Sequence, residues 1–168
     1  MELLAYALEW YSASRRLGTR GKLLEWFAKP MSHLRLHHVG CAVPSIEDGL
    51  RPYTQAMGFT RVSKIVEIAS QKVRVCFVET APGVFIELVQ GLADDSPVSS
   101  FLKRRQYFYH VCYSSPDVRA TVEHLETHGF RRLSVFASEA FGGTECAFLL
   151  TPEMALVELC TDGAFSLL

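Results

Sequence analysis

The short, mostly apolar run of residues 36–43 predicts a β-strand, and Pro44 ends it. Because successive side chains of a strand point to opposite faces, one face of this segment is apolar and suited to packing against a helix. The other face carries His38 beside Gly40 and Ala42, two very small residues that leave room around the imidazole. This strand is therefore the first candidate for a functional site.

The periodicity next predicts one helix and three further strands before residue 91. Ser45 is a suitable N-cap for a helix that runs to about Met57, and Gly58 favours its end. Strands are predicted over residues 59–69, 72–79 and 84–90, with a turn at residues 81–83. The order of elements in this half of the chain is β-α-β-β-β.

The second half of the chain repeats this order. After a linker with one short helix, the pattern predicts a strand at 108–114, a helix at 117–128, and strands at 131–136, 144–150 and 155–160. His38 recurs as His110, 72 positions later, and Glu87 recurs as Glu158, 71 positions later. A repeat at a nearly constant offset indicates a duplicated module. We therefore predict an α+β fold of two tandem βαβββ modules.

The repeat also sets the expected domain boundaries. Residues 1–34 lie outside it and carry apolar positions at helical spacing, which predicts a helical N-terminal arm. We expect this arm to pack on the domain or on a second subunit; contact of a basic amphipathic helix with a membrane surface is the less favoured alternative. The duplicated domain is expected at residues 35–162. Its first module covers 35–90, the linker 91–105 and the second module 106–162.

Composition excludes several classes of protein. The 168 residues carry a formal net charge of −1, which would not attract nucleic acid, and no apolar run approaches the ~20 residues of a membrane-spanning helix. The N-terminus has no clear signal-peptide cleavage site. The cysteines form no paired spacing, so we interpret them as buried free thiols of a reducing compartment and expect a cytoplasmic protein. They are Cys41, Cys76, Cys112, Cys146 and Cys160.

The two glutamates of the repeat are the strongest chemical signal. Glu87 and Glu158 each lie between two apolar residues in the middle of a predicted strand, where a lone carboxylate is costly unless it is paired or binds a metal. If the strands of each module curl into a half-barrel, both glutamates can meet His38 and His110 in one cleft. Two nitrogen and two oxygen ligands suit Mn, Co, Ni, Fe or Mg, and zinc also fits. Any one of the four alone is better explained as a partly exposed or hydrogen-bonded strand residue, whereas all four together with the repeat favour a metal site.

Other potential ligands lack this symmetry. Cys112 and Cys160 share faces with the anchor residues, but their counterparts in module one are Gly40 and Val89, which cannot bind a metal. Four further histidines have no equivalent in the other module, so we predict that they are surface or helix-face residues. These are His33, His37, His124 and His128.

The two modules and the His/Glu/His/Glu set resemble the vicinal oxygen chelate superfamily, which includes glyoxalases, bleomycin resistance proteins and dioxygenases. Within it, residues 86–88, 95–97 and 101–102, with 148–152 and 156–159, resemble methylmalonyl-CoA epimerase. The resemblance implies paired modules around a U-shaped metal cleft, with His38, Glu87, His110 and Glu158 as ligands. It also implies a homodimer.

The implied activity is proton transfer next to the carbonyl of a malonyl-type acyl thioester. A divalent ion (Co, Mn, Ni, Mg or Zn) would act as a Lewis acid, and Glu158 or Glu87 would act as the base. The sequence departs from the epimerase pattern at two points within the domain. Tyr109 stands where epimerases usually carry a histidine, and Val75 stands where some bacterial epimerases place a base glutamate.

These departures keep other functions open. The same ligand set would serve a glyoxalase I-like lactoylglutathione lyase acting on a glutathione hemithioacetal. A ring-cleaving dioxygenase is less favoured, because its iron is held by two histidines and one carboxylate. A metal-free small-molecule binding protein of the same fold is the alternative outside enzymes, and the complete ligand set counts against it.

Overall fold

The computed structural model describes residues 33–167, which form an eight-stranded sheet in the order β2-β3-β4-β1-β5-β8-β7-β6. Almost all of the predicted N-terminal arm lies outside the described residues. The strands are β1 (Arg35–Ala42), β2 (Val66–Ile68), β3 (Val73–Ala81), β4 (Val84–Gly91), β5 (Phe108–Ser115), β6 (Arg131–Ser138), β7 (Thr144–Leu150) and β8 (Leu156–Thr161). Both modules therefore contribute four strands to one sheet.

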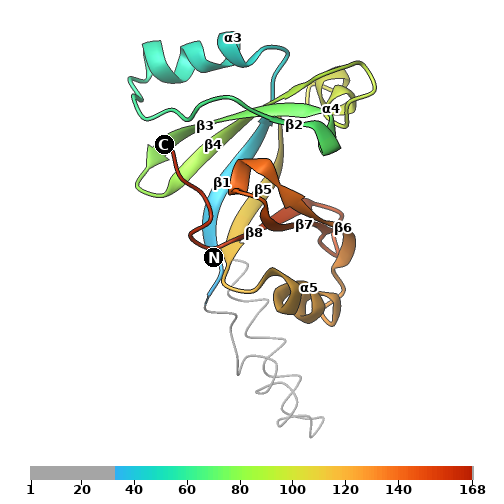
Figure 1. Ribbon diagram of the computed structural model, residues 1–168. Helices are drawn as coiled ribbons and strands as arrows, with labels where there is room; N and C mark the ends of the chain where they lie inside the picture. Colours follow the sequence, from blue (N-terminus) through green and yellow to red (C-terminus); the bar gives the residue numbers. More distant parts are fainter. Residues whose placement is uncertain (1–32, 168) are drawn as a thin grey trace, which may run out of the picture. The chain divides into compact units, whose positions relative to one another are not determined.

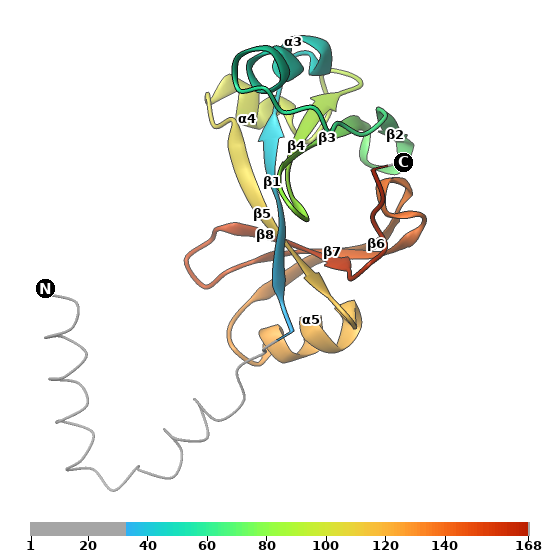
Figure 2. The ribbon, with the colours of Figure 1, turned by 90° about the vertical axis from the view of Figure 1, so that its left-hand side faces the viewer.

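The sheet has the symmetry expected of a duplicated module. β1 pairs in parallel with β4, and β5 pairs in parallel with β8, while β1 and β5 run antiparallel at the centre. The remaining pairs are antiparallel. Figure 2 shows that the strands of both modules curve toward the same side of the central pair. The predicted half-barrel architecture is confirmed.

The helices of the first module and the linker lie at one end of the curled sheet, and the helix of the second module lies at the other end (Figure 1). They are α3 (Ile46–Arg51), which continues as a π-helix over Pro52–Ala56, α4 (Ser99–Lys103) and α5 (Val118–Glu126). Ser45 caps α3 by accepting a hydrogen bond from the amide of Asp48, and Asp117 caps α5 by accepting one from the amide of Ala120. No helix among residues 33–167 is long and apolar enough to cross a bilayer.

The predicted strand over residues 59–69 is wrong for most of its length. Only Val66–Ile68 forms a strand, and Val62 makes a single isolated bridge to Val78 of β3. The side-chain hydroxyl of Ser63 accepts a hydrogen bond from the amide of Phe77, at 2.9 Å, so a side chain joins the backbone pairing at this edge. The sequence pattern predicted a continuous strand here and did not predict the interrupted pairing with β3.

Three clusters of buried apolar residues hold the sheet and helices together. One lies beneath α3 and includes Ile46 and Leu88, and another lies beneath α5 and includes Val122 and Leu159. The third contains phenylalanines of both modules and packs against Phe165 near the C-terminus. This third cluster adjoins the four anchor residues of the repeat.

Candidate metal centre

The structure brings the four anchor side chains together. Nε2 of His38 lies 3.0 Å from Nε2 of His110, 3.1 Å from Oε2 of Glu158 and 3.4 Å from Oε2 of Glu87. Nε2 of His110 lies 3.0 Å from Oε2 of Glu158 and 3.5 Å from Oε2 of Glu87. Each residue presents one donor atom to a common point, and all four atoms lie within 4.8 Å of one another.

Strand order and register explain this convergence. The four residues come from β4, β1, β5 and β8, which are neighbours at the centre of the sheet. Gly40 of β1 lies opposite both Glu87 of β4 and His110 of β5. Glu158 of β8 pairs with the residue of β5 that lies opposite His38. The duplication thus places two His/Glu pairs across the antiparallel β1–β5 contact.

Gly40 is necessary for this arrangement because the imidazole of His110 lies directly over it. A Cβ atom at Gly40 would stand 2.0 Å from Cε1 and 2.2 Å from Nδ1 of His110, closer than real Cβ contacts occur. We expected the small residues beside His38 to leave room for something other than protein. The space above Gly40 is instead filled by the second histidine.

The cluster is almost completely buried, and its charges act on one another strongly. Exposed fractions are 0% for His38, 6% for Glu87, 3% for His110 and 4% for Glu158. Burial opposes the charged form of His38, but Glu87 and Glu158 outweigh burial and raise its pKa to about 10. Burial likewise opposes ionisation of Glu158, but hydrogen bonds from His110 and His38 lower its pKa to about 2. The cluster therefore favours positive charge at its centre, next to the carboxylate groups.

A divalent cation fits these donors. Nitrogen and oxygen donors lie ~2.0–2.2 Å from such an ion, and donors at that distance are about 3–3.5 Å apart when they occupy neighbouring positions. The measured separations of 3.0–3.5 Å between the imidazole nitrogens and the other donors match this spacing. Two imidazole nitrogens that face each other at 3.0 Å need either a shared hydrogen or a cation between them, because two facing lone pairs would repel. His38, Glu87, His110 and Glu158 are thus the residues that would hold the ion.

A cavity of about 420 Å³ adjoins the cluster and includes Glu87 and Glu158 in its lining. Most of its wall is apolar, including Val75 of β3 and the aromatic rings of Phe136 and Phe148. Within the part of the chain that the structure describes, no third carboxylate lines this cavity. Such a site can surround an apolar substituent while presenting two carboxylates to a reacting carbon.

Val75 and Tyr109, the two positions where the sequence departs from the epimerase pattern, both line the cavity. Val75 is buried and lines the cavity, so it adds a hydrophobic surface where some relatives would place a base. Tyr109 stacks on Phe101, with ring centroids 4.6 Å apart, and meets the ring of His110 edge-on at 4.5 Å. Burial raises the pKa of Tyr109 well above its ordinary value, so its hydroxyl remains protonated beside the cluster.

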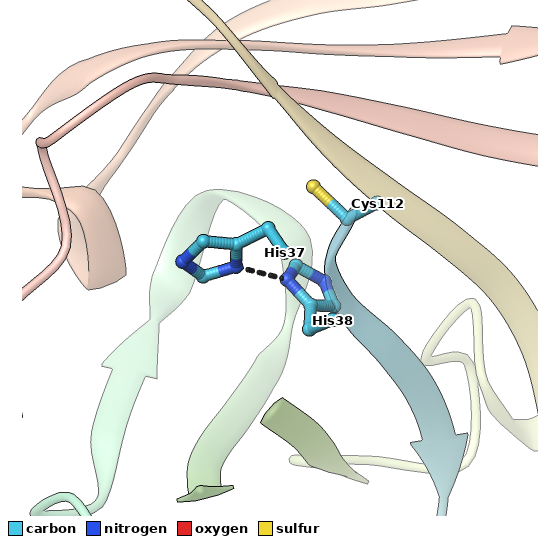
Figure 3. A group of neighbouring side chains, drawn as sticks. All are labelled: His37, His38 and Cys112. Atoms are coloured by element: carbon cyan, nitrogen blue, oxygen red, sulfur yellow. Dashed lines mark hydrogen bonds between the residues drawn. The ribbon is translucent and has the colours of Figure 1, made fainter. Parts of the chain in front are cut away.

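The prediction for His37 is wrong, because its ring is half-buried inside the curl of the sheet rather than on the surface. The β1–β5 pairing shifts register between Leu36 and His38, and this bulge turns His37 to the same side as His38. Its Nδ1 atom lies 2.8 Å from Nδ1 of His38 (Figure 3). Burial, followed in size by the neighbouring His38, lowers the pKa of His37 to about 4. Strict strand alternation could not reveal this contact.

The remaining potential ligands lie as follows. His33 and His128 are exposed and His124 is half-buried on α5. Cys112 lies near His37 and His38, and Figure 3 shows its side chain beside theirs. Its thiol donates to the carbonyl of Tyr113 at 3.8 Å, and burial raises its pKa well above the ordinary value, which disfavours the thiolate that metals bind.

Comparison with known proteins agrees with this architecture. The profile of the glyoxalase/bleomycin resistance protein/dioxygenase superfamily matches residues 37–148, which include three of the four anchor residues. The chain belongs to this superfamily. The superfamily and the predicted fold are therefore confirmed together.

Relatives at about 30% identity include epimerases. The chain is 33% identical over 101 residues to the ethylmalonyl-CoA/methylmalonyl-CoA epimerase of Cereibacter sphaeroides, which covers 59% of this chain and 74% of the relative. It is 32% identical to the mitochondrial methylmalonyl-CoA epimerase of Mus musculus over 68% of this chain and 65% of the relative. It is also 31% identical to YqjC of Bacillus subtilis, an uncharacterized protein, over 75% of this chain and 91% of the relative.

Solved structures show the same fold. A Streptomyces coelicolor methylmalonyl-CoA epimerase variant in complex with 2-nitronate-propionyl-CoA superposes with a TM-score of 0.67 at 24% identity, over 78% of this chain and 99% of that one. A hypothetical protein from Bacillus halodurans superposes with a TM-score of 0.69 at 24% identity, over 77% of this chain and 94% of that one.

Proposed function

We propose that this chain is a divalent-metal-dependent isomerase that transfers a proton next to the carbonyl of an acyl thioester, in the manner of a methylmalonyl-CoA epimerase. The observation that carries the proposal is the meeting of two imidazoles and two carboxylates at the lining of an apolar cavity. The sequence similarity to two CoA-thioester epimerases supports the substrate class.

In this proposal His38, Glu87, His110 and Glu158 hold the ion, and the apolar cavity wall excludes water from the reacting carbon. When bound, a divalent ion supplies Lewis acidity toward a carbonyl oxygen, which makes the neighbouring C–H more acidic by several kcal/mol. Each carboxylate has a second oxygen besides the one that faces the cluster, and both residues line the cavity.

Epimerisation requires a proton to leave one face of a carbon and to return to the other face. Glu87 and Glu158 occupy equivalent positions in the two modules and approach the cluster from β4 and β8, on opposite sides of β1 and β5. One glutamate, as the carboxylate, would accept the proton, and the other would return a proton that it has first taken up from solvent. This division of roles uses only residues that the cavity contains.

A second candidate function is glyoxalase I-like formation of a thioester from a glutathione hemithioacetal. Val75 places no carboxylate on the β3 wall, so any base must come from Glu87 or Glu158. In this reaction the same four residues would hold the ion, and one of the two glutamates would also transfer the proton. The two candidate functions differ in their substrates: an acyl-CoA thioester for the first and a glutathione hemithioacetal for the second.

The deciding experiment measures both activities on the full chain. The protein is stripped with a chelator and reloaded separately with Co, Mn, Ni, Mg or Zn. Exchange of the α-proton of methylmalonyl-CoA with deuterated water is followed by NMR, and lactoylglutathione formation by absorbance. We expect metal-dependent exchange that is lost in Glu158→Ala. Lactoylglutathione formation without exchange would favour the second candidate. Tight binding of a thioester with neither reaction would indicate a binding protein.

A further inference from the structure

The two imidazoles of the cluster are held in different ways. The ring of His110 lies on Gly40 and between the rings of Tyr109 and Phe148, and its Nδ1 atom has no hydrogen-bond partner among the described residues. His38 instead has a polar neighbour at the same atom, because Nδ1 of His37 lies 2.8 Å away. The two modules therefore differ at the atom that determines how a ligand ring is oriented.

The β1 bulge creates this contact. Without the register shift between Leu36 and His38, consecutive side chains would point to opposite faces and the two histidines could not meet. The bulge places His37 among aromatic rings that fix its orientation. Its ring centroid lies 5.0 Å from Phe85, 5.3 Å from Phe141 and 5.3 Å from Phe165.

The hydrogen bond restricts the tautomer of His38. Two Nδ1 atoms 2.8 Å apart share one hydrogen, so one donates and the other accepts. Nε2 of His38 faces His110 and both carboxylates. For this Nε2 atom to offer its lone pair to an ion, the hydrogen of the neutral ring must lie on Nδ1, where His37 can accept it.

We propose that His37 is a positioning residue that accepts a hydrogen bond from Nδ1 of His38 and so directs the Nε2 lone pair of His38 toward the metal site. This inference rests on the proposed metal-dependent function, but it concerns affinity for the ion rather than turnover. Residues that hydrogen-bond the far nitrogen of a metal-binding histidine change metal affinity by about 10–100-fold.

The test compares two variants of the full chain by Co(II) titration after chelator treatment. In His37→Phe an aromatic ring remains in the aromatic surroundings but the acceptor is lost. In His37→Asn a side-chain oxygen can occupy the position of Nδ1 and restore the acceptor. We expect Co(II) affinity to fall at least about tenfold in His37→Phe, with an altered visible spectrum, and to recover most of that loss in His37→Asn. His124→Phe, the same change on α5, serves as the matched control and is expected to bind like the wild type.

Several results would overturn the inference. Wild-type affinity and spectrum in His37→Phe would show that the contact does not orient His38. Equal losses in both variants would indicate a packing role only. A measurement on the wild type guards against misfolded variants: in Zn(II)-loaded protein labelled with ¹⁵N-histidine, NMR should show the hydrogen of His38 on Nδ1. A hydrogen on Nε2, or no ion bound by the wild type, would contradict the proposal. Failure of both enzyme assays despite tight metal binding would instead contradict only the proposed function.

Discussion

At the scale of single residues, the site depends on positions that carry no functional group as much as on those that do. The repeat identified His38, Glu87, His110 and Glu158, and the structure brings all four together. The role of Gly40 became visible only with the backbone in place, because the ring that covers it comes from a residue 70 positions away in sequence. The function of the four side chains as metal ligands stays a prediction.

Gly40→Ala should disrupt the metal site without changing any ligand. The added Cβ atom would stand 2.0 Å from Cε1 of His110, so the imidazole must move away from the cluster. We expect Co(II) affinity to fall by at least about tenfold, measured by titration. The matched control is Gly49→Ala, whose Cβ atom would meet only the side chains of Val43 and Leu88, at 3.0 Å or more. Unchanged affinity in Gly40→Ala would contradict the assigned role.

Metal affinity should rise with pH. Burial opposes the charged form of His38, but the two glutamates raise its pKa to about 10. At neutral pH the ring is therefore protonated on both nitrogens, including Nε2. Nε2 must lose that proton to bind an ion, so lowering the pH stabilises the metal-free protein relative to the loaded one. Between pH 6 and 9 we expect about a tenfold gain in affinity per pH unit, which calorimetry in buffers of different ionisation enthalpy can detect as one proton released. A flat profile without proton release would contradict this electrostatic picture.

At the scale of elements, periodicity and capping residues predicted most of the fold. Both helix caps, Ser45 and Asp117, occupy the predicted starts of their helices. The failures are local. The expected strand at residues 59–69 forms only over Val66–Ile68. His37, predicted at the surface because module two has no equivalent, is turned inward by a bulge in β1. Bulges and edge irregularities arise from pairing across strands, which a single segment does not encode.

The Asp117 cap offers a test at this scale. The carboxylate accepts a hydrogen bond from the amide of Ala120 at 2.9 Å, so Asp117→Ala leaves that amide without its partner. We expect the free energy of unfolding to fall by about 1 kcal/mol in urea titration. Asp117→Asn retains an acceptor and should remain within a few tenths of the wild type. Metal affinity should not change in either variant, and equal stability of Asp117→Ala and the wild type would show that the cap is dispensable.

At the scale of the whole molecule, two modules share one sheet and one cluster, as the repeat predicted. The domain was predicted to end at residue 162, and residues after this position also pack against it. The ring of Phe165 lies 4.5 Å from Phe77 and 4.9 Å from Phe85, so the C-terminal segment contacts module one. Sequence patterns could not show this, because the segment follows the last strand of the repeat. Homodimer formation and the role of residues 1–34 stay predictions.

Phe165→Ala should therefore destabilise the folded domain although the residue lies beyond the repeat. Its half-buried ring packs on phenylalanines of β3 and β4 and on Phe141. We expect a loss of about 1–3 kcal/mol in the free energy of unfolding, less than for a fully buried ring. Phe108→Ala, the same change at a ring of β5 that is 59% exposed, is the control and should cost less stability. A stability equal to that of the wild type would place the end of the folded domain before Phe165.

The central claim is that one divalent ion binds where the two modules meet. Its most direct test is anomalous diffraction from crystals of the Co(II)-loaded protein. The account predicts one peak about 2.0–2.3 Å from Nε2 of His38, Nε2 of His110 and a carboxylate oxygen of each of Glu87 and Glu158. A fully loaded crystal with its peak elsewhere, or with no peak among these four side chains, would contradict it.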